Sequence, residues 1–313
     1  MNLGIVTDEI DRNFARAVRI GTELGIRRYE IRNLPSGRAP MCAQKDLAHV
    51  KRIAEGEGIE ITALSPGLFK YTEDGAAFVR EMSEVYPLAV EWPHRWKLLG
   101  LITFGFHKPG ATEENAVALP RAVVPKQIID WLVRAGEQAI ADGILLLIEP
   151  EPICWADTPT ITAELIERSR SQRLRITYDP GNVAWLEQRD PIADFDRAAR
   201  WIANVHVNDL LPLRPGAARP VYMPAGEDMI DFRAHFEKLH RAGYRGLSHL
   251  NPTWTEARRP FVAARKGANF LPARNTRLQP EEHTLKPVSR VLAEFSARAH
   301  HLQATKNDGL PHG

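Results

Sequence analysis

A unit of amphipathic helix, glycine and short apolar strand recurs along the chain, and it constrains the fold more than any other feature. Four copies stand out: "RAVRIGTELGIRRYEIRN", "LAHVKRIAEGEGIEITALSP", "IIDWLVRAGEQAIADGILLLIEP" and "FRAHFEKLHRAGYRGLSHLNP". Their glycines are Gly25, Gly58, Gly143 and Gly243. Glycine often ends a helix because it adopts the left-handed conformation at little cost. Short, nearly continuous apolar runs are typical of parallel strands that helices cover.

Eight strands are expected when the whole chain is considered. They are Leu3–Thr7, Arg28–Arg32, Glu60–Leu64, Leu101–Phe106, Ile144–Glu149, Arg175–Asp179, Asn204–Asn208 and Gly246–Asn251. Helical segments separate most of them. Eight strands alternating with helices predict an α/β protein with a (β/α)₈ TIM barrel, a parallel eight-stranded barrel with outer helices. A doubly wound open sheet is disfavoured, because no G-x-G-x-x-G follows an early strand.

The length of 313 residues suits a single TIM-barrel domain over residues 1–313. Residues 256–285 are rich in Arg, Pro and Asn and show weak periodicity, so we expect an insertion there after the last strand. Residues 286–302 are expected to form the closing helix. The tail from about Ala304 is expected to be frayed.

The charge and composition exclude several classes of function. The net charge is only +2, from 41 basic and 39 acidic residues without a long run of either sign, so neither a nucleic acid nor a membrane is an expected partner. No stretch approaches the roughly 18 apolar residues of a membrane span. The N-terminus does not resemble a signal peptide, and the two cysteines, Cys42 and Cys154, suit a reducing compartment. A cytoplasmic protein is therefore expected.

Polar residues stand at the carboxyl ends of the expected strands, beginning with the two acids of "GILLLIEPEP". The set comprises Glu30, Arg32, His107, Lys108, Glu149, Glu151, Asp179, His206, Asn208, Asp209, His249 and Asn251. All carboxyl ends of a barrel's strands share one face, which is where such enzymes build their active sites.

Each of these residues also has an ordinary structural explanation. Asp179 before Pro-Gly is typical of a turn, and His206 alone would suit a structural histidine. Glu30 and Arg32 could pair with each other or with a neighbouring strand. Taken together, carboxylates, an imidazole and a carboxamide that converge at a barrel mouth need a cation to offset their charge. Oxygen ligands with one nitrogen suit one divalent ion, and the sequence does not choose among Mn²⁺, Mg²⁺, Co²⁺ and Zn²⁺.

Several short motifs occur in an order and spacing that resemble a known family. They are "LGIVTDEI", "YEIRNL", "ALSPGLFK", "IEPEP", "YDPGN", "HVND" and "PAGEDMIDF". In this order the chain resembles, up to about Trp254, the xylose isomerase-like TIM-barrel superfamily and in particular its sugar phosphate isomerase/epimerase branch. The motifs are specific for the superfamily but not for a substrate.

The resemblance implies a metal site built from the fifth to the eighth strand. Its ligands would be Glu149, Asp179 and His206, with Asn251 at the position where the family usually has a glutamate. An asparagine can bind a metal through its carbonyl oxygen, but it cannot transfer a proton as a carboxylate does. The change therefore disfavours an epimerase with two glutamate bases, and it favours proton transfer between adjacent carbons by Glu149 alone.

The expected function is therefore that of a metal-dependent isomerase or epimerase acting on a small sugar or sugar-like hydroxy-carbonyl compound. Further contacts to this carbohydrate substrate are expected from Arg32, Lys70, His107, Lys108, Glu151, Asp209 and His249. A dehydratase or lyase on the same scaffold, and a non-catalytic sugar-binding barrel, are the alternatives. A nuclease is disfavoured by the absence of a basic face. A homo-oligomer is compatible with the resemblance, and residues 256–285 would suit an interface or a lid.

Overall fold

The computed structural model describes residues 2–213, 217, 220–223, 225 and 228–250. Within this part of the chain, eight parallel strands close into a barrel in the order β1-β12-β9-β8-β7-β6-β5-β2, which confirms the (β/α)₈ prediction. The strands are β1 (Asn2–Val6), β2 (Arg28–Ile31), β5 (Glu60–Leu64), β6 (Gly100–Phe104), β7 (Leu145–Glu149), β8 (Leu174–Tyr178), β9 (Ile202–Val207) and β12 (Leu247–Leu250).

The glycines predicted to end helices do so in the left-handed region. Their φ values are 77° at Gly25, 59° at Gly58, 70° at Gly143 and 79° at Gly243. The eight expected strands are all present, and within the described residues their ends differ from the predicted ends by at most two residues. The fourth, for example, ends at Phe104 rather than Phe106, because Phe106 has a φ of 63° that a strand does not allow.

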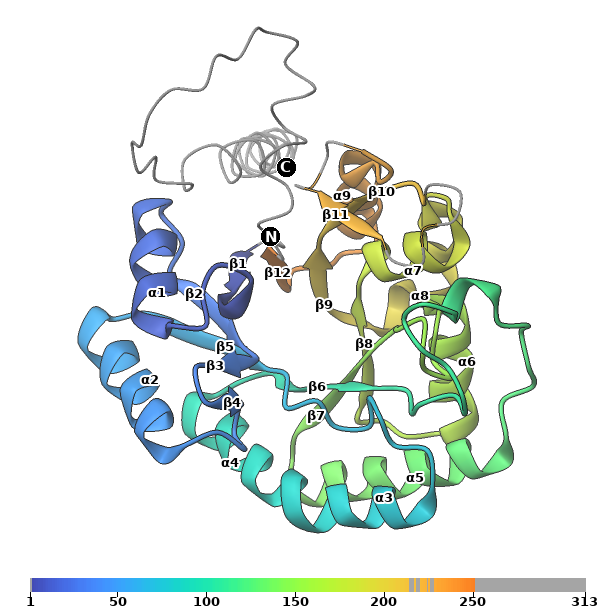
Figure 1. Cartoon of the computed structure of the whole chain (residues 1–313), viewed down its shortest axis with the longest axis horizontal. Coiled ribbons are helices and arrows are strands. Elements are labelled where there is room, and N and C mark those ends of the chain that lie inside the picture. Colours follow the sequence, from blue (N-terminus) through green and yellow to red (C-terminus); the bar gives the residue numbers. More distant parts are fainter. Residues whose placement is uncertain (1, 214–216, 218–219, 224, 226–227, 251–313) are drawn as a thin grey trace, which may run out of the picture.

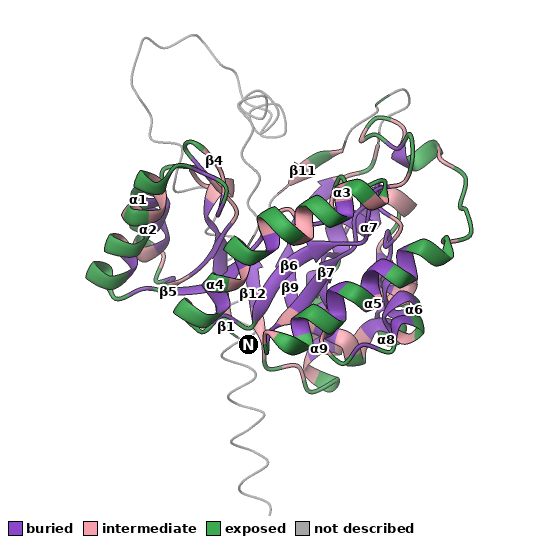
Figure 2. Ribbon diagram, turned by 90° about the horizontal axis from the view of Figure 1, so that it is seen from below, coloured by how far each residue is buried: buried purple, intermediate pink, exposed green. Residues whose placement is uncertain are grey.

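Nine α-helices lie outside the strands in the described residues (Figure 1). They are α1 (Phe14–Glu23), α2 (Gln44–Glu57), α3 (Gly75–Arg80), α4 (Tyr86–Trp96), α5 (Lys126–Ala141), α6 (Pro159–Ser169), α7 (Pro180–Glu187), α8 (Phe195–Ala198) and α9 (Phe232–Arg241). Figure 2 shows the strands almost wholly buried, while the helices expose their outward faces. Burial of the strands explains why their sequences are nearly continuous apolar runs.

Two short hairpins, which the sequence analysis did not predict, follow strands at the carboxyl end of the barrel. Strands β3 (Asn33–Leu34) and β4 (Gly37–Arg38) form one hairpin after β2. Strands β10 (Asp209–Leu211) and β11 (Val221–Met223) form the other after β9. Both hairpins add side chains to the end of the barrel where the polar strand tips lie.

Two phenylalanines in the left-handed region fix the loops after β5 and β6. Phe69 has a φ of 71° and Phe106 has a φ of 63°, and bulky residues rarely adopt this backbone conformation. Their rings pack 4.8 Å apart between centroids, and Phe78 and Trp131 stack beside them. This aromatic packing offsets the backbone strain and positions the residues that follow each phenylalanine, Lys70 and His107.

The described part of the chain contains no helix that is both long enough and apolar enough to cross a membrane. The expected insertion at 256–285, the closing helix and the tail from Ala304 lie outside the described residues.

Candidate metal centre and active site

Three side chains from neighbouring strands meet inside the carboxyl end of the barrel. Glu149 ends β7, Asp179 directly follows β8, and His206 lies in β9. Nδ1 of His206 is 3.2 Å from Oε1 of Glu149 and 3.8 Å from Oδ2 of Asp179. One ligand atom from each residue falls within 4.8 Å of the others, and all three residues are buried. The structure thus brings together the three residues that the sequence predicted as metal ligands.

Asp179 owes its position to the segment "YDPGN". Its Oδ1 accepts a hydrogen bond from the backbone N–H of Asn182 at 3.0 Å and so caps helix α7, which Pro180 opens. Its Oδ2 accepts a hydrogen bond from Nδ2 of Asn208 at 3.1 Å. A Cβ at Gly181 would lie only 1.5 Å from Oδ1 of Asn208, so glycine is required for this approach. Asp179, which the sequence predicted as either a turn residue or a ligand, therefore caps helix α7 and also belongs to the cluster.

Burial and mutual repulsion separate the proton affinities of the two carboxyl groups. Burial, together with the charge of Glu149, raises the pKa of Asp179 to about 7. Burial also raises the pKa of Glu149, but the charge and hydrogen bond of His206, followed by the charge of Lys70, outweigh it and lower the pKa overall. Two adjacent carboxylates cannot both ionise freely without a compensating cation.

Glu30 lies on the far side of the His206 ring and fixes its orientation. Its Oε2 is 2.9 Å from Nε2 of His206. Burial lowers the pKa of His206, but the charges of Glu30 and Glu149 outweigh it and raise the pKa well above its ordinary value. In the neutral imidazole, Nε2–H would donate to Glu30, and the Nδ1 lone pair would face Glu149 and Asp179. Pairing of a ligand histidine with a carboxylate through its other nitrogen is common at metal sites.

His249, predicted as a substrate contact, is completely buried inside the barrel beside His206. Its Nε2 is 2.8 Å from Oγ1 of Thr62, and its Nδ1 is 3.0 Å from Oδ1 of Asn204. Burial lowers its pKa to about 4, so the ring is neutral at pH 7. A Cβ at Gly4 would lie 2.5 Å from the ring, which explains the glycine on β1. Both ring nitrogens of His249 therefore have partners, and the side chain packs beside His206 as a structural support of the cluster.

The donor set fits a divalent metal. Glu149 and Asp179 offer carboxylate oxygens, His206 offers one nitrogen, and the ligand atoms are close enough for one ion to contact all three. A second group of the same kind, Glu30, His206 and His249, fits less well, because both ring nitrogens of His249 already have partners outside the group, Thr62 and Asn204. Asn251, the predicted fourth ligand, lies outside the described residues.

Glu151 and Lys70 form a buried ion pair next to the cluster, with Nζ of Lys70 3.2 Å from Oε2 of Glu151. Burial raises the pKa of Glu151, the charge of Lys70 lowers it, and the charge of Glu149 raises it again, so that the net pKa is raised. Nδ2 of Asn182 lies 3.4 Å from both Oε1 of Glu149 and Oε2 of Glu151. The two acids of "IEPEP" therefore do point the same way, although β7 ends at Glu149.

The remaining predicted contacts are spread around the rim. Arg32 does not pair with Glu30 but with Asp8 and Glu9, which follow the neighbouring strand β1, so the pairing with a neighbouring strand is the one that the structure shows. Asp209 accepts hydrogen bonds from the backbone N–H groups of Leu210, Asp228 and Ile230, and it thereby ties the segment 228–230 to β10.

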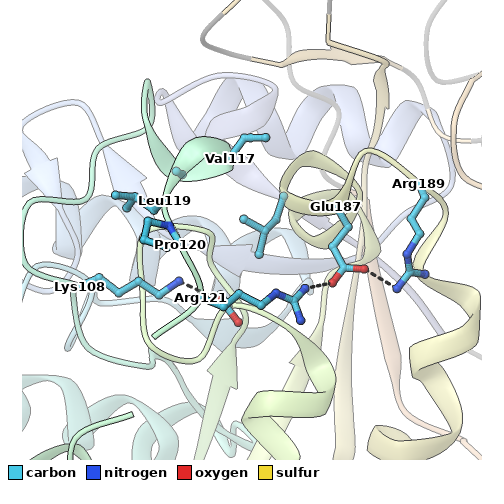
Figure 3. Close-up of a pocket in the computed structure, with 10 residues that line it drawn as sticks. Lys108, Val117, Leu119, Pro120, Arg121, Glu187 and Arg189 are labelled. Carbon is cyan, nitrogen blue, oxygen red and sulfur yellow. Dashed lines mark hydrogen bonds and ion pairs between the residues drawn. The ribbon is translucent and has the colours of Figure 1, made fainter. Parts of the chain in front are cut away.

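His107 and Lys108 lie in the loop after β6. Nδ1 of His107 is 2.8 Å from Oε1 of Glu73, and Nζ of Lys108 is 2.6 Å from Oδ2 of Asp157. Lys108 lines a separate cavity of about 420 Å³ beside α7, where Arg121 and Arg189 both pair with Glu187 (Figure 3). The structure thus associates Lys108 with this cavity.

Three side chains that contact the ligands are not among the predicted site residues: Glu30, Asn182 and Asn208. Glu30 and Asn208 stand at strand tips in the sequence, but their contacts with His206 and Asp179 depend on how the strands pair in the barrel. Asn182 belongs to "YDPGN", a motif in which the sequence suggests a role only for Asp179. In all three cases a polar residue in a motif is the available signal.

Comparisons with known proteins identify relatives of this fold. A curated Escherichia coli K12 protein named "Putative L-ribulose-5-phosphate 3-epimerase SgbU" is 30% identical over 154 residues, which are 48% of this chain and 52% of that protein. The match thus spans about half the length of the curated relative. The structure also resembles two solved proteins at identities that establish the fold alone.

The first is described as the probable 3-DHS dehydratase AsbF of Bacillus anthracis, with a TM-score of 0.63, 17% identity, and coverage of 85% of this chain and 98% of that one. The second is the IOLI protein with a bound zinc atom, with a TM-score of 0.61, 16% identity, and coverage of 80% and 88%. The family model described as "Xylose isomerase-like TIM barrel" matches residues 18–274. That match covers most of the sequence, and the chain therefore belongs to the xylose isomerase-like TIM-barrel family.

Proposed function

We propose that this protein is a divalent-metal-dependent isomerase or epimerase of a small sugar or sugar-like hydroxy-carbonyl compound. The observation that carries the proposal is the buried cluster of Glu149, Asp179 and His206, in which two carboxylates and one imidazole face one another within 4.8 Å. The family membership and the epimerase name of the Escherichia coli relative support the reaction class.

Glu149, Asp179 and His206 would hold the metal, with Asn251 as a fourth ligand. A divalent ion bound there supplies a Lewis acid that polarises the carbonyl of a substrate and offsets the negative charge that develops on its oxygen. Zinc in the similarly folded IOLI protein is consistent with such a site, and Mn²⁺, Mg²⁺ and Co²⁺ suit the same donors.

Glu149 is the proposed base. Its pKa is lowered, so it is ionised at neutral pH and able to accept a proton. Removal of the proton from the carbon next to the carbonyl leaves the C–H electron pair to form a carbon–carbon double bond, and the carbonyl oxygen takes the negative charge. Return of the proton to the former carbonyl carbon, together with transfer of the hydroxyl proton from the adjacent oxygen to the former carbonyl oxygen, gives the isomerised product. Return of a proton to the same carbon from the other face gives the epimer and requires a second proton donor on that face.

The pair of Glu151 and Lys70 is placed to assist. The raised pKa of Glu151 makes this residue a suitable proton donor to a substrate oxygen, and Lys70 contributes positive charge beside it. Asn182, which reaches both Glu149 and Glu151, keeps the two carboxylates in fixed relation. These assignments require only residues that the structure brings within contact distance of one another.

Incorporation of solvent deuterium tests the proposal. Ketoses and inositol-type ketones would be incubated in D₂O with the protein, with and without Mn²⁺, and followed by NMR. We expect exchange at the carbon next to the carbonyl that requires Mn²⁺ and falls by at least about 100-fold in Glu149→Gln, since a positioned base contributes about 10²–10⁴-fold. Glu167→Gln, which changes a carboxylate of α6 paired with Arg197 and Arg200, is the matched control.

The outcomes are distinct. Unchanged exchange in Glu149→Gln would rule out this base. Loss of water from the substrate after proton removal would indicate the dehydratase or lyase alternative instead. Absence of Mn²⁺ binding, measured by calorimetry, together with absence of exchange would favour the non-catalytic sugar-binding barrel.

A further inference from the structure

Arg38 is an arginine at the mouth of the barrel whose hydrogen bonds within the described residues go to the neutral oxygens of Ser65. It ends β4, and Ser65 follows β5. Nε of Arg38 donates to the backbone oxygen of Ser65 at 2.8 Å, and Nη2 donates to Oγ of Ser65 at 2.7 Å. A Cβ at Gly67 would lie 2.9 Å from Nε of Arg38, so glycine at this position leaves room for the guanidinium. Three separate features therefore fix where this side chain lies.

No carboxylate in the described part of the chain forms an ion pair with Arg38. A largely buried arginine usually pairs with a carboxylate, because desolvation of the cation is costly. Arg32 follows this rule through Asp8 and Glu9, which outweigh the effect of burial and raise its pKa. For Arg38, burial and then the charge of Arg32 lower the pKa. A guanidinium has five N–H donors, and the bonds to Ser65 use two of them.

A second cation lies over the same aromatic ring. The guanidinium carbon of Arg38 is 5.9 Å from the ring centroid of Phe104, and Nζ of Lys70 is 5.0 Å from it. Phe104 is the register partner of Glu149 across the β6–β7 pair. The ring thus places both cations beside the strand tip that carries the proposed base.

We propose that Arg38 and Lys70 form an anion subsite of this active site, which binds a terminal carboxylate or phosphate of the hydroxy-carbonyl substrate. The inference rests on the proposed function, because it places the anion on the same molecule that Glu149 deprotonates. The substrate class then narrows to sugar acids or sugar phosphates. A terminal anion would accept hydrogen bonds from the remaining Arg38 donors and lie beside the Lys70 ammonium, which also pairs with Glu151.

Three probes with the same three-carbon skeleton separate the two anions: glycerol 3-phosphate, glycerate and uncharged glycerol. Each would be titrated calorimetrically into the Mn²⁺-saturated protein. We expect at least one anion to bind about 10-fold or more tightly than glycerol, and Arg38→Met to remove that preference, in line with hydrogen bonds to a charged group. Arg134→Met is the matched control, because Arg134 also lies over a phenylalanine, Phe78, but on helix α5.

Each result has a clear consequence. Loss of preference for glycerol 3-phosphate alone in Arg38→Met identifies a phosphate, and loss for glycerate alone identifies a carboxylate. Equal affinity of all three probes for the wild type, or a preference that survives in Arg38→Met, overturns the subsite. Arg38→Lys, which keeps the charge without the guanidinium fork, should retain part of the preference and serves if Arg38→Met does not fold. Mn²⁺ binding is measured separately, so failure of the metal site is distinguished from failure of the anion subsite.

Discussion

Among the buried histidines of this barrel, His235 contacts one carboxylate and His206 lies near three. His235, on the outer helix α9, has Nε2 2.7 Å from Oδ1 of Asp190 and Nδ1 2.8 Å from the hydroxyl of Tyr178. Backbone N–H groups of Ile192 and Asp231 also donate to Asp190. His206, inside the barrel, has three carboxylates near its ring, those of Glu30, Glu149 and Asp179.

The difference shows how a structural network can be told from a functional one. One carboxylate per imidazole, with its oxygens accepting backbone hydrogen bonds, stabilises the fold by itself. Three buried carboxylates around one imidazole repel one another, and burial, followed by the charge of Glu149, raises the pKa of Asp179 to about 7. Excess charge of this kind costs stability unless a cation offsets it, and such cost is typical of functional sites.

The largest effect is expected when one of the repelling carboxylates is neutralised. Asp179→Asn keeps the shape of the side chain and the helix cap, because asparagine also caps helices well. We expect the affinity for Mn²⁺ to fall by at least about 100-fold, since even residues that only support a ligand are worth about 10–100-fold. We also expect the free energy of unfolding of the metal-free protein to rise, because a like-charge pair is removed. Calorimetry and urea denaturation measure the two effects. Unchanged Mn²⁺ affinity would contradict the ligand assignment.

Glu30→Gln tests whether the carboxylate behind His206 supports the ligand. Glutamine can still contact Nε2 of His206 but lacks the charge that fixes Nε2–H toward it. Mn²⁺ affinity should fall by about 10–100-fold. Glu60→Gln, on the neighbouring strand β5 but paired with the exposed Arg28, should leave the affinity unchanged. If the two substitutions lowered the Mn²⁺ affinity equally, Glu30 would act only through its long-range charge and not through its contact with His206.

The fold was predictable because its signals are local. A glycine such as Gly143 ends a helix wherever the chain is placed, and an apolar run such as 144–149 forms a buried strand in most contexts. The strand tips follow from the same signals, so Glu149, Asp179 and His206 could be assigned to one face. The exact strand ends could not, because Phe106 leaves the strand to pack against Phe69 and Trp131, which are distant in sequence.

The partners of the cluster depend on contacts across the barrel, so they could not be predicted from the local sequence. Glu30 meets His206 across 176 residues of sequence only because β1 and β12 close the barrel. Arg38 lies on a strand of two residues, too short to show periodicity. Arg32 stands in a recognisable motif and is a predicted substrate contact, and Asp8 and Glu9 bind its guanidinium. Local sequence shows which residues are polar, but the fold decides which charges remain unpaired.

A smaller effect on the cluster is expected from Gly181→Ala. The new Cβ would lie 1.5 Å from Oδ1 of Asn208, so Asn208 must move and lose its hydrogen bond to Asp179. We expect Mn²⁺ affinity to fall by about 10-fold, the lower end of the range for groups that orient a ligand. Gly56→Ala is the control, since a Cβ there meets no atom within 4 Å and alanine favours the helix α2. If both variants bind Mn²⁺ as the wild type does, Asn208 does not orient Asp179.

Substitutions in the network of His235 and Asp190 should change the stability of the protein and not its metal binding. Backbone and His235 hydrogen bonds lower the pKa of Asp190 against the opposing effect of burial. Because the folded-state pKa is the lower one, the stabilisation is present above the unfolded value of about 4 and is lost as the pH falls through the folded value. The groups near Asp190 include His235, Tyr178, Arg189 and Asp194.

Asp190→Asn should therefore destabilise the protein by about 1–3 kcal/mol at pH 7, the usual worth of hydrogen bonds to a charged group. The difference from the wild type should shrink near pH 3, and Mn²⁺ affinity should stay the same. Urea denaturation at several pH values measures the first two quantities, and calorimetry the third. A loss of Mn²⁺ affinity as large as that of Asp179→Asn would show that the outer network is coupled to the cluster. The two histidines would then belong to one charge system, with Tyr178, directly before Asp179 in the chain, as the link between them.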